Sequence, residues 1–200
     1  MNDRTLHQNL SQQLADVRAC NLCADVLPLG PKPILQMNAQ AKILIAGQAP
    51  GRKAHEIGYP FDDASGDRLR AWMGIDRTIF YDDTKIAILP MGFCFPGTGK
   101  SGDLPPRPEC AETWRKKLLG LLTNIQLTLV IGQYALQWHR PESKGLHLTE
   151  GVADWRSTLP YSLALPHPSP RNNLWLKRNP WFEKEVLSLL QGRVQTVLDS

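Results

Sequence analysis

The sequence of 200 residues has no apolar run close to the roughly 20 residues of a membrane-spanning helix. Its polar beginning, MNDRTLHQNLSQQL, lacks the apolar centre of a secretory signal. We therefore expect a cytoplasmic protein with no membrane partner. In that reducing compartment, four cysteines are unsuited to a disulfide framework, and we interpret them as metal ligands or buried thiols.

The sequence also lacks internal repeats, low-complexity tracts and a strong excess of either charge. A net charge of +4 permits a polyanionic partner such as nucleic acid but does not require one. The length suits one domain over residues 1–200, built on a single sheet with helices on both faces.

Short apolar runs alternate with segments of helical periodicity. Buried strands are predicted at 43–46, 85–89, 128–132 and 162–165. Helices are predicted at about 2–19, 67–73, 110–122, 134–139 and 180–191. This alternation is typical of an α/β fold with a central four-stranded parallel sheet.

Three of the predicted strands end in turns rich in Gly, Pro and polar residues. These turns are G-Q-A-P-G at 47–51, P-M-G-F-C at 90–94 and H-P-S-P-R-N-N at 167–173. Because ligands bind at the carboxyl ends of parallel strands, we expect the three turns to converge on one crevice, with Gln48 facing it. Taken alone, the first turn is equally consistent with an ordinary strand end.

Two further segments contain glycine and proline. The cluster at 58–61 places Phe61 on an irregular loop beside the first turn, although a lone Phe is more often a core aromatic. The segment 96–106 is predicted to be a long loop.

Cysteine spacing suggests a metal site. Cys20 and Cys23 are separated by two residues, so a short turn brings both thiolates to one side of a site. With Cys94 and Cys110 they make a set of four thiolates, which fits structural zinc or an iron–sulfur cluster equally well by geometry alone.

Taken in order, these motifs resemble the uracil-DNA glycosylase superfamily, most closely its iron–sulfur-containing family 4 branch. That branch carries G-E-[AG]-P-G, six residues and G-x-P-F, and here 47–51 is followed by six residues and Gly58-Tyr59-Pro60-Phe61. The H-P-S motif of the superfamily stands at 167–169. The cysteine spacing of the branch is matched as well, with fifteen residues between Cys94 and Cys110.

The resemblance implies a monomeric α/β/α sandwich that holds a [4Fe-4S] cluster and cleaves the bond between a flipped DNA base and its deoxyribose. It implies that Phe61 stacks on the base and that His167 donates to the base carbonyl where negative charge develops. The residues expected at the base are Gln48, Ala49, Phe61, Pro90 and His167. The expected DNA contacts are Ser169, Arg171 and Asn172, with Arg171 at the position of a wedge residue, and the expected cluster ligands are Cys20, Cys23, Cys94 and Cys110.

Two positions depart from the branch. Gln48 replaces its acidic residue; an amide can still position water, and a carboxylate from Glu56 or Asp62 could act instead. Pro90 replaces the Asn that reads uracil, so hypoxanthine or another modified base becomes a candidate substrate.

The leading hypothesis is a monofunctional glycosylase of base excision repair. The alternatives are an iron–sulfur DNA-binding protein without activity and a hydrolase of free nucleosides or nucleotides. A set of basic residues favours a polymeric substrate: Arg52, Lys53, Arg171, Lys177 and Arg178.

Overall fold

The computed structural model describes residues 3–100, 102–143 and 145–200. At its centre is a sheet in the order β2-β1-β5-β6 with every pair parallel. The strands are β1 (Ile43–Ala46), β2 (Ile86–Ile88), β5 (Leu127–Ile131) and β6 (Ser162–Leu165). The four-stranded parallel sheet predicted from the sequence is confirmed, with strand bounds within one residue of those expected.

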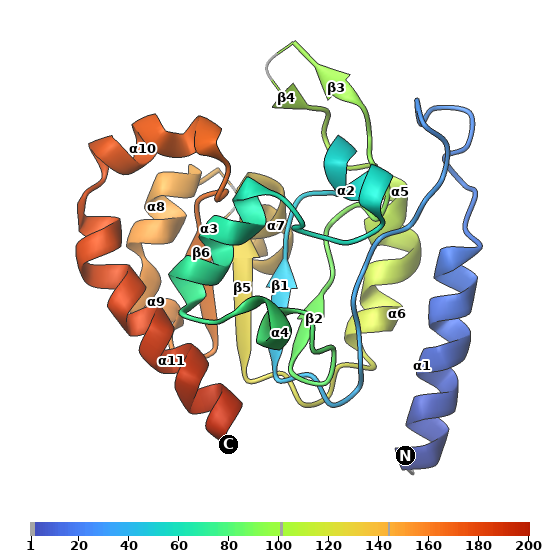
Figure 1. Ribbon diagram of the computed structural model, residues 1–200, viewed down its shortest axis with the longest axis horizontal. Helices are drawn as coiled ribbons and strands as arrows, with labels where there is room; N and C mark the ends of the chain where they lie inside the picture. Colours follow the sequence, from blue (N-terminus) through green and yellow to red (C-terminus); the bar gives the residue numbers. More distant parts are fainter. Residues whose placement is uncertain (1–2, 101, 144) are drawn as a thin grey trace.

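Helices cover both faces of this sheet, as in the predicted α/β/α sandwich (Figure 1). Ile43 and Ile45 of β1 pack in the core cluster that includes side chains of α3 (Ala64–Met73) and α11 (Leu187–Asp199). Leu44 lies in the other cluster, with side chains of α1 (Asp3–Arg18) and α6 (Lys116–Leu119). Successive strand residues therefore serve opposite layers, as the pleat of a strand requires.

Shorter elements fill the connections. They are α2 (Arg52–Ile57), α4 (Arg77–Phe80), β3 (Thr98–Gly99), β4 (Gly102–Asp103), α5 (Pro108–Cys110), η1 (Ala111–Arg115), α7 (Gln133–His139), η2 (Pro141–Ser143), α8 (Leu148–Ala153), α9 (Trp155–Thr158), η3 (Pro170–Asn172), α10 (Asn173–Arg178) and η4 (Phe182–Val186). In the described part of the chain, no helix has the length and apolar character needed to cross a membrane.

Two of the differences from the sequence-based expectation bear on the core and on the cleft. The last helix continues to Asp199, because Val194 and Val197 keep the apolar spacing and are fully buried. The segment 96–106 is more than a loop, since β3 and β4 form an antiparallel pair. In Figure 1 this hairpin projects beyond the carboxyl ends of the central strands.

A buried arginine fixes the turn after β2. Arg115 is fully buried, and its guanidinium donates to the carbonyls of Leu89 and Pro90, the latter at 2.7 Å. It also lies 2.6 Å from Nε2 of His139, at the end of α7, and 4.7 Å from the ring centroid of Trp138. Because a guanidinium can only donate, His139 accepts this bond through Nε2 and is neutral.

His139 should make the fold sensitive to acid. Burial and the Arg115 guanidinium lower the pKa of His139 to about 3, against about 6.5 in an unfolded chain. Between these values only the unfolded chain binds the proton. The free energy of unfolding therefore decreases as the pH is lowered, by at most about 1.4 kcal/mol per pH unit. His139→Gln retains an acceptor without titrating and should reduce this slope in urea unfolding below pH 6.5. Equal slopes for both proteins would contradict the assignment.

Candidate active site

A cleft of about 710 Å³ opens at the carboxyl edge of the sheet. This is within the range of roughly 300–1,000 Å³ that is usual for ligand sites. All the base- and DNA-contacting residues predicted from the sequence line it: Gln48, Ala49, Phe61, Pro90, His167, Ser169, Arg171 and Asn172. Arg52 and Lys53 also line the cleft, whereas Lys177 and Arg178 lie on α10 outside its lining.

Backbone hydrogen bonds join the first two turns. The N–H of Met91 donates to the carbonyl of Gly47 at 2.8 Å, and the N–H of Gly92 donates to that of Gln48 at 2.9 Å. These bonds continue the pairing of β1 with β2 beyond the strands. Gln48 and the buried Pro90 therefore stand on one rigid wall of the cleft.

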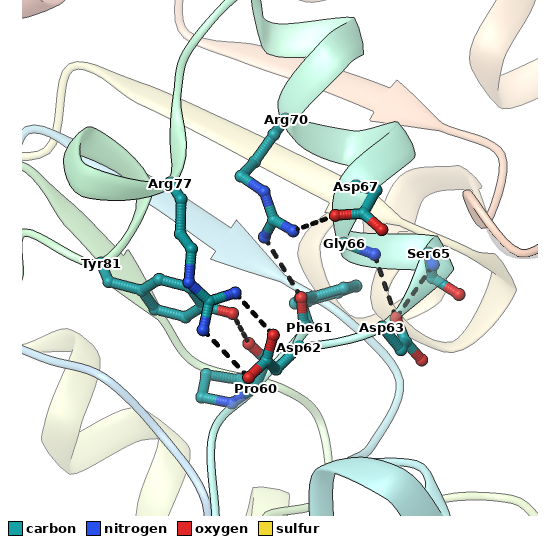
Figure 2. Close-up of polar contacts among 10 residues, drawn as sticks. All are labelled: Pro60, Phe61, Asp62, Asp63, Ser65, Gly66, Asp67, Arg70, Arg77 and Tyr81. Carbon is teal, nitrogen blue, oxygen red and sulfur yellow. Dashed lines mark hydrogen bonds and ion pairs between the residues drawn. The ribbon is translucent and has the colours of Figure 1, made fainter. Parts of the chain in front are cut away.

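The loop that carries Phe61 has an unusual backbone. Phe61 has a φ of 55°, and it is the one non-glycine residue with positive φ in the described part of the chain. For a bulky residue this conformation costs on the order of 1–3 kcal/mol and needs support from its surroundings. Arg70 supplies part of it by donating to the Phe61 carbonyl at 3.2 Å, while Asp67 holds the same guanidinium at 2.7 Å (Figure 2).

Contacts on either side of Phe61 complete the support. Asp62 accepts two bonds from Arg77, at 2.5 and 3.0 Å, and the Tyr81 hydroxyl donates to the Pro60 carbonyl at 2.9 Å. Asp63 caps α3, as Figure 2 shows, with Oδ1 accepting from two backbone N–H groups at 2.9 and 3.0 Å. Every residue from Pro60 to Asp63 is thus held by a named partner.

The ring of Phe61 packs against the first turn. A Cβ at Gly47 would lie 3.4 Å from this ring, an ordinary van der Waals distance, so the ring lies directly against the turn. The ring also packs edge to face against Phe80, with the two ring centroids 6.3 Å apart. The Phe61 ring therefore has a fixed position, where it lines the cleft and also packs against the core.

The environment of His167 determines its protonation. Its Nδ1 accepts from the backbone N–H of Ser169 at 3.2 Å, which leaves the ring proton on Nε2. Burial lowers the pKa of His167, partly opposed by the negative charges of Asp63 and Asp103. The ring is therefore a neutral imidazole at pH 7 with one N–H, on Nε2, to donate.

The loop around His167 is held from both sides. Asn172 donates through Nδ2 to the His167 carbonyl at 2.7 Å, and Arg68 of α3 donates to the Ser169 carbonyl at 3.2 Å. Arg171 extends from this loop to the β3–β4 hairpin, where its Nη1 lies 2.8 Å from the position that a Cβ on Gly102 would occupy. Arg171 therefore links the third turn to the hairpin.

The carboxylates in the cleft were not those expected. Glu56 and Asp62 do not line it, and Asp62 is engaged by Arg77, which lowers the pKa of its carboxyl group. The carboxylates among the described lining residues are Asp63 and Asp103. Asp63 stands two residues after Phe61 and could have been considered, whereas nothing in the sequence pattern places Asp103 near the first turn.

The four cysteines line a second, narrower cavity, together with Arg107 and Trp114. None of them forms a disulfide, and Nε1 of Trp114 donates to the sulfur of Cys20 at 3.3 Å. Burial, reinforced by the neighbouring thiols, raises the pKa of Cys110 to about 11. In residues 3–100, 102–143 and 145–200, no group of three or more His, Cys, Asp or Glu is arranged to hold a single metal ion.

The fold is an α/β sandwich with a polar and aromatic cleft at the strand ends, flanked by basic side chains. In proteins of this architecture, ligands bind at the carboxyl edge of the sheet. Residues 35–191 match the family model of the uracil DNA glycosylase superfamily, and the chain therefore belongs to that superfamily. Its members are DNA glycosylases, which are hydrolases that act on DNA. The superfamily predicted from the motifs is confirmed.

Gly66 should be essential to the Phe61 loop. A Cβ at this position would lie 1.7 Å from the Phe61 carbonyl oxygen, so Gly66→Ala must displace the strained loop. We expect a loss of about 2–3 kcal/mol in the free energy of unfolding, measured with urea. The matched control is Gly192→Ala on α11, where the added Cβ meets no atom within 4 Å and helix propensity favours alanine by up to about 1 kcal/mol. Equal stabilities of the two variants would contradict this role of Gly66.

Proposed function

We propose that this protein is a monofunctional DNA glycosylase that hydrolyses the N-glycosidic bond of a flipped uracil or other deaminated or modified base, leaving an abasic site for base excision repair. The observation that carries the proposal is the meeting of the Phe61 ring and the neutral His167 in one cleft at the sheet edge. The Phe61 ring can stack on a planar base, and the His167 imidazole can donate a hydrogen bond to it.

Extrusion of a base into the cleft costs a few kcal/mol, least for a damaged or mispaired base. Phe61 offsets part of this cost by stacking. Its platform is held before the base arrives, because Arg70, Gly66 and Gly47 fix the backbone and ring. Little ordering entropy is then lost on binding.

His167 acts on the leaving base. As the glycosidic bond breaks, negative charge accumulates on a base carbonyl oxygen, and the Nε2–H of the neutral imidazole donates to it. A donor placed where charge develops lowers the barrier by roughly 3–4 kcal/mol. The bond from Ser169 N–H to Nδ1 fixes the tautomer that makes this possible.

The rim of the cleft suits a phosphate backbone. Ser169, Arg171 and Asn172 come from the third turn, and Arg52 and Lys53 come from α2, which begins directly after the first turn. These polar and basic groups hold DNA while the base occupies the cleft. This arrangement favours a polymeric substrate over a free nucleoside.

Base choice depends on the wall formed by Pro90. The Pro90 side chain cannot hydrogen-bond, and its carbonyl already accepts from Arg115. Discrimination between bases therefore falls to backbone groups of the first two turns and to Gln48. Hypoxanthine and xanthine join uracil as candidate substrates.

The second candidate function is a DNA-binding protein without glycosylase activity. It is favoured by Gln48, which cannot accept a proton from water, and by Pro90. The two functions differ in whether a base is released.

The four cysteines are proposed as ligands of a [4Fe-4S] cluster in the family 4 manner, with structural zinc as the alternative. Four free thiols around one cavity, with Trp114 donating to a sulfur, supply a donor set for either group, and the match to the cysteine spacing of the family 4 branch favours the cluster. Cys20 and Cys23 after α1, Cys94 at the end of the second turn and Cys110 on α5 would hold the cluster, which would tie these segments together. We assign it a structural role in a cytoplasmic monomer.

Base excision tests the function. The purified protein, handled without oxygen, is incubated with labelled oligonucleotides containing uracil, hypoxanthine, xanthine or no damage, and abasic sites are revealed with alkali. We expect release of at least one base without strand breaks before alkali. His167→Ala should slow release by about 100–1,000-fold with unchanged DNA affinity.

The control is His147→Asn, which removes an imidazole outside the cleft and keeps a residue that caps α8. It should excise at the wild-type rate. No release from any oligonucleotide, despite salt-sensitive DNA binding, would favour the non-catalytic alternative.

Metal analysis tests the cofactor. We expect a brown protein absorbing near ~400 nm, with about four irons and four sulfides per chain. Cys110→Ala should lose the colour and melt at a lower temperature. The protein that remains folded should excise the base at a rate close to that of wild type. A colourless wild-type protein with one zinc per chain would contradict the cluster.

A further inference from the structure

We propose that Asp103, on the β3–β4 hairpin, is a further catalytic residue that accepts the proton of the attacking water. Gln48 is the residue that positions Asp103. The inference rests on the proposed function and assigns to that reaction the carboxylate that the first turn lacks.

Asp103 stands directly beside the first turn. It lines the cleft, and its Oδ2 lies 3.3 Å from the position that a Cβ on Gly51 would occupy. The carboxylate therefore packs against the backbone of G-Q-A-P-G. It is also close enough to His167 to raise the pKa of that imidazole.

The other nearby carboxylates already have partners. Asp62 is held by Arg77 outside the cleft, and Asp63 uses Oδ1 to cap α3. In the described part of the chain, no hydrogen-bond donor or cation pairs with the Asp103 carboxylate. Of the two carboxylates that line the cleft in the described part of the chain, Asp103 has both oxygens available for water, whereas Asp63 has only Oδ2.

Gln48 connects the first turn to the strand that carries Asp103. Its Nε2 donates to the Leu104 carbonyl at 3.2 Å, and the Leu104 N–H donates to the Gly97 carbonyl at 2.8 Å. A carboxylate at position 48 could not donate this bond. The amide at 48 therefore holds the segment that carries the Asp103 carboxylate against the first turn.

The proposed step is hydrolysis of the N-glycosidic bond by water. The bond between C1′ and the base nitrogen breaks, and its electron pair leaves on the base. The water oxygen bonds to C1′, and its proton passes to Asp103 and then to solvent. The base anion, held by the Nε2–H of His167, takes a proton from solvent and leaves neutral. Before attack, the Asp103 charge also stabilises the cationic sugar.

The test compares Asp103→Asn with wild type on the oligonucleotide that wild type cleaves, by single-turnover excision, DNA affinity and melting temperature. We expect the rate to fall by at least about 100-fold. DNA affinity should be equal or higher, since a negative charge near phosphates is removed. The matched control is Asp199→Asn at the end of α11, which should excise at the wild-type rate.

A double-mutant cycle tests the role of Gln48. Gln48→Met removes the hydrogen-bond donor to Leu104 and keeps a side chain of similar size. The excision rate of this variant should fall without loss of DNA affinity. In the Asp103→Asn background the same change should add little further loss, because Gln48 acts through Asp103. Full additivity of the two losses would contradict this coupling.

Failure of the inference can be told from failure of the proposed function. Wild-type excision with an equal rate for Asp103→Asn would overturn the assignment of Asp103 and leave the glycosylase intact. No excision by wild type would overturn both.

Discussion

The parallel pairing of four short strands is the constraint on which the rest of this structure depends. Parallel strands end at the same edge of a sheet, so turns far apart in the sequence meet there. The two backbone bonds from Met91 and Gly92 to Gly47 and Gln48 extend this pairing into the turns. The three turns of the cleft follow from that edge, and Gln48 attaches the hairpin to it.

Conformational strain at Phe61 is the second organising feature. A left-handed backbone at a bulky residue is retained only where its neighbours determine it fully. Here the neighbours are Arg70 on the carbonyl, Gly66 in close contact with it, Pro60 before Phe61, and Asp62 and Asp63 after it, each with its own partner. The result is an aromatic platform in place before any base binds, which is the preorganisation that recognition of a flipped base requires.

Much of the fold and site could be predicted from the sequence. The strands were found because β-branched apolar runs report burial on both faces, and the cleft residues followed because strand ends converge. The β3–β4 hairpin was missed because two-residue strands made largely of glycine have no alternating pattern. Asp103 was missed with it, and the buried Arg115 because its partners are backbone carbonyls rather than charged residues.

The central claim is that a base leaves DNA through the cleft at the carboxyl edge of the sheet. The structure of the protein bound to a duplex carrying a stable abasic-site analogue tests it most directly. The account predicts the abasic sugar at the mouth of the cleft, between the His167 loop and the β3–β4 hairpin, with phosphates against Ser169 and Arg171. A duplex bound on another face, with this cleft far from the abasic sugar, would contradict the account.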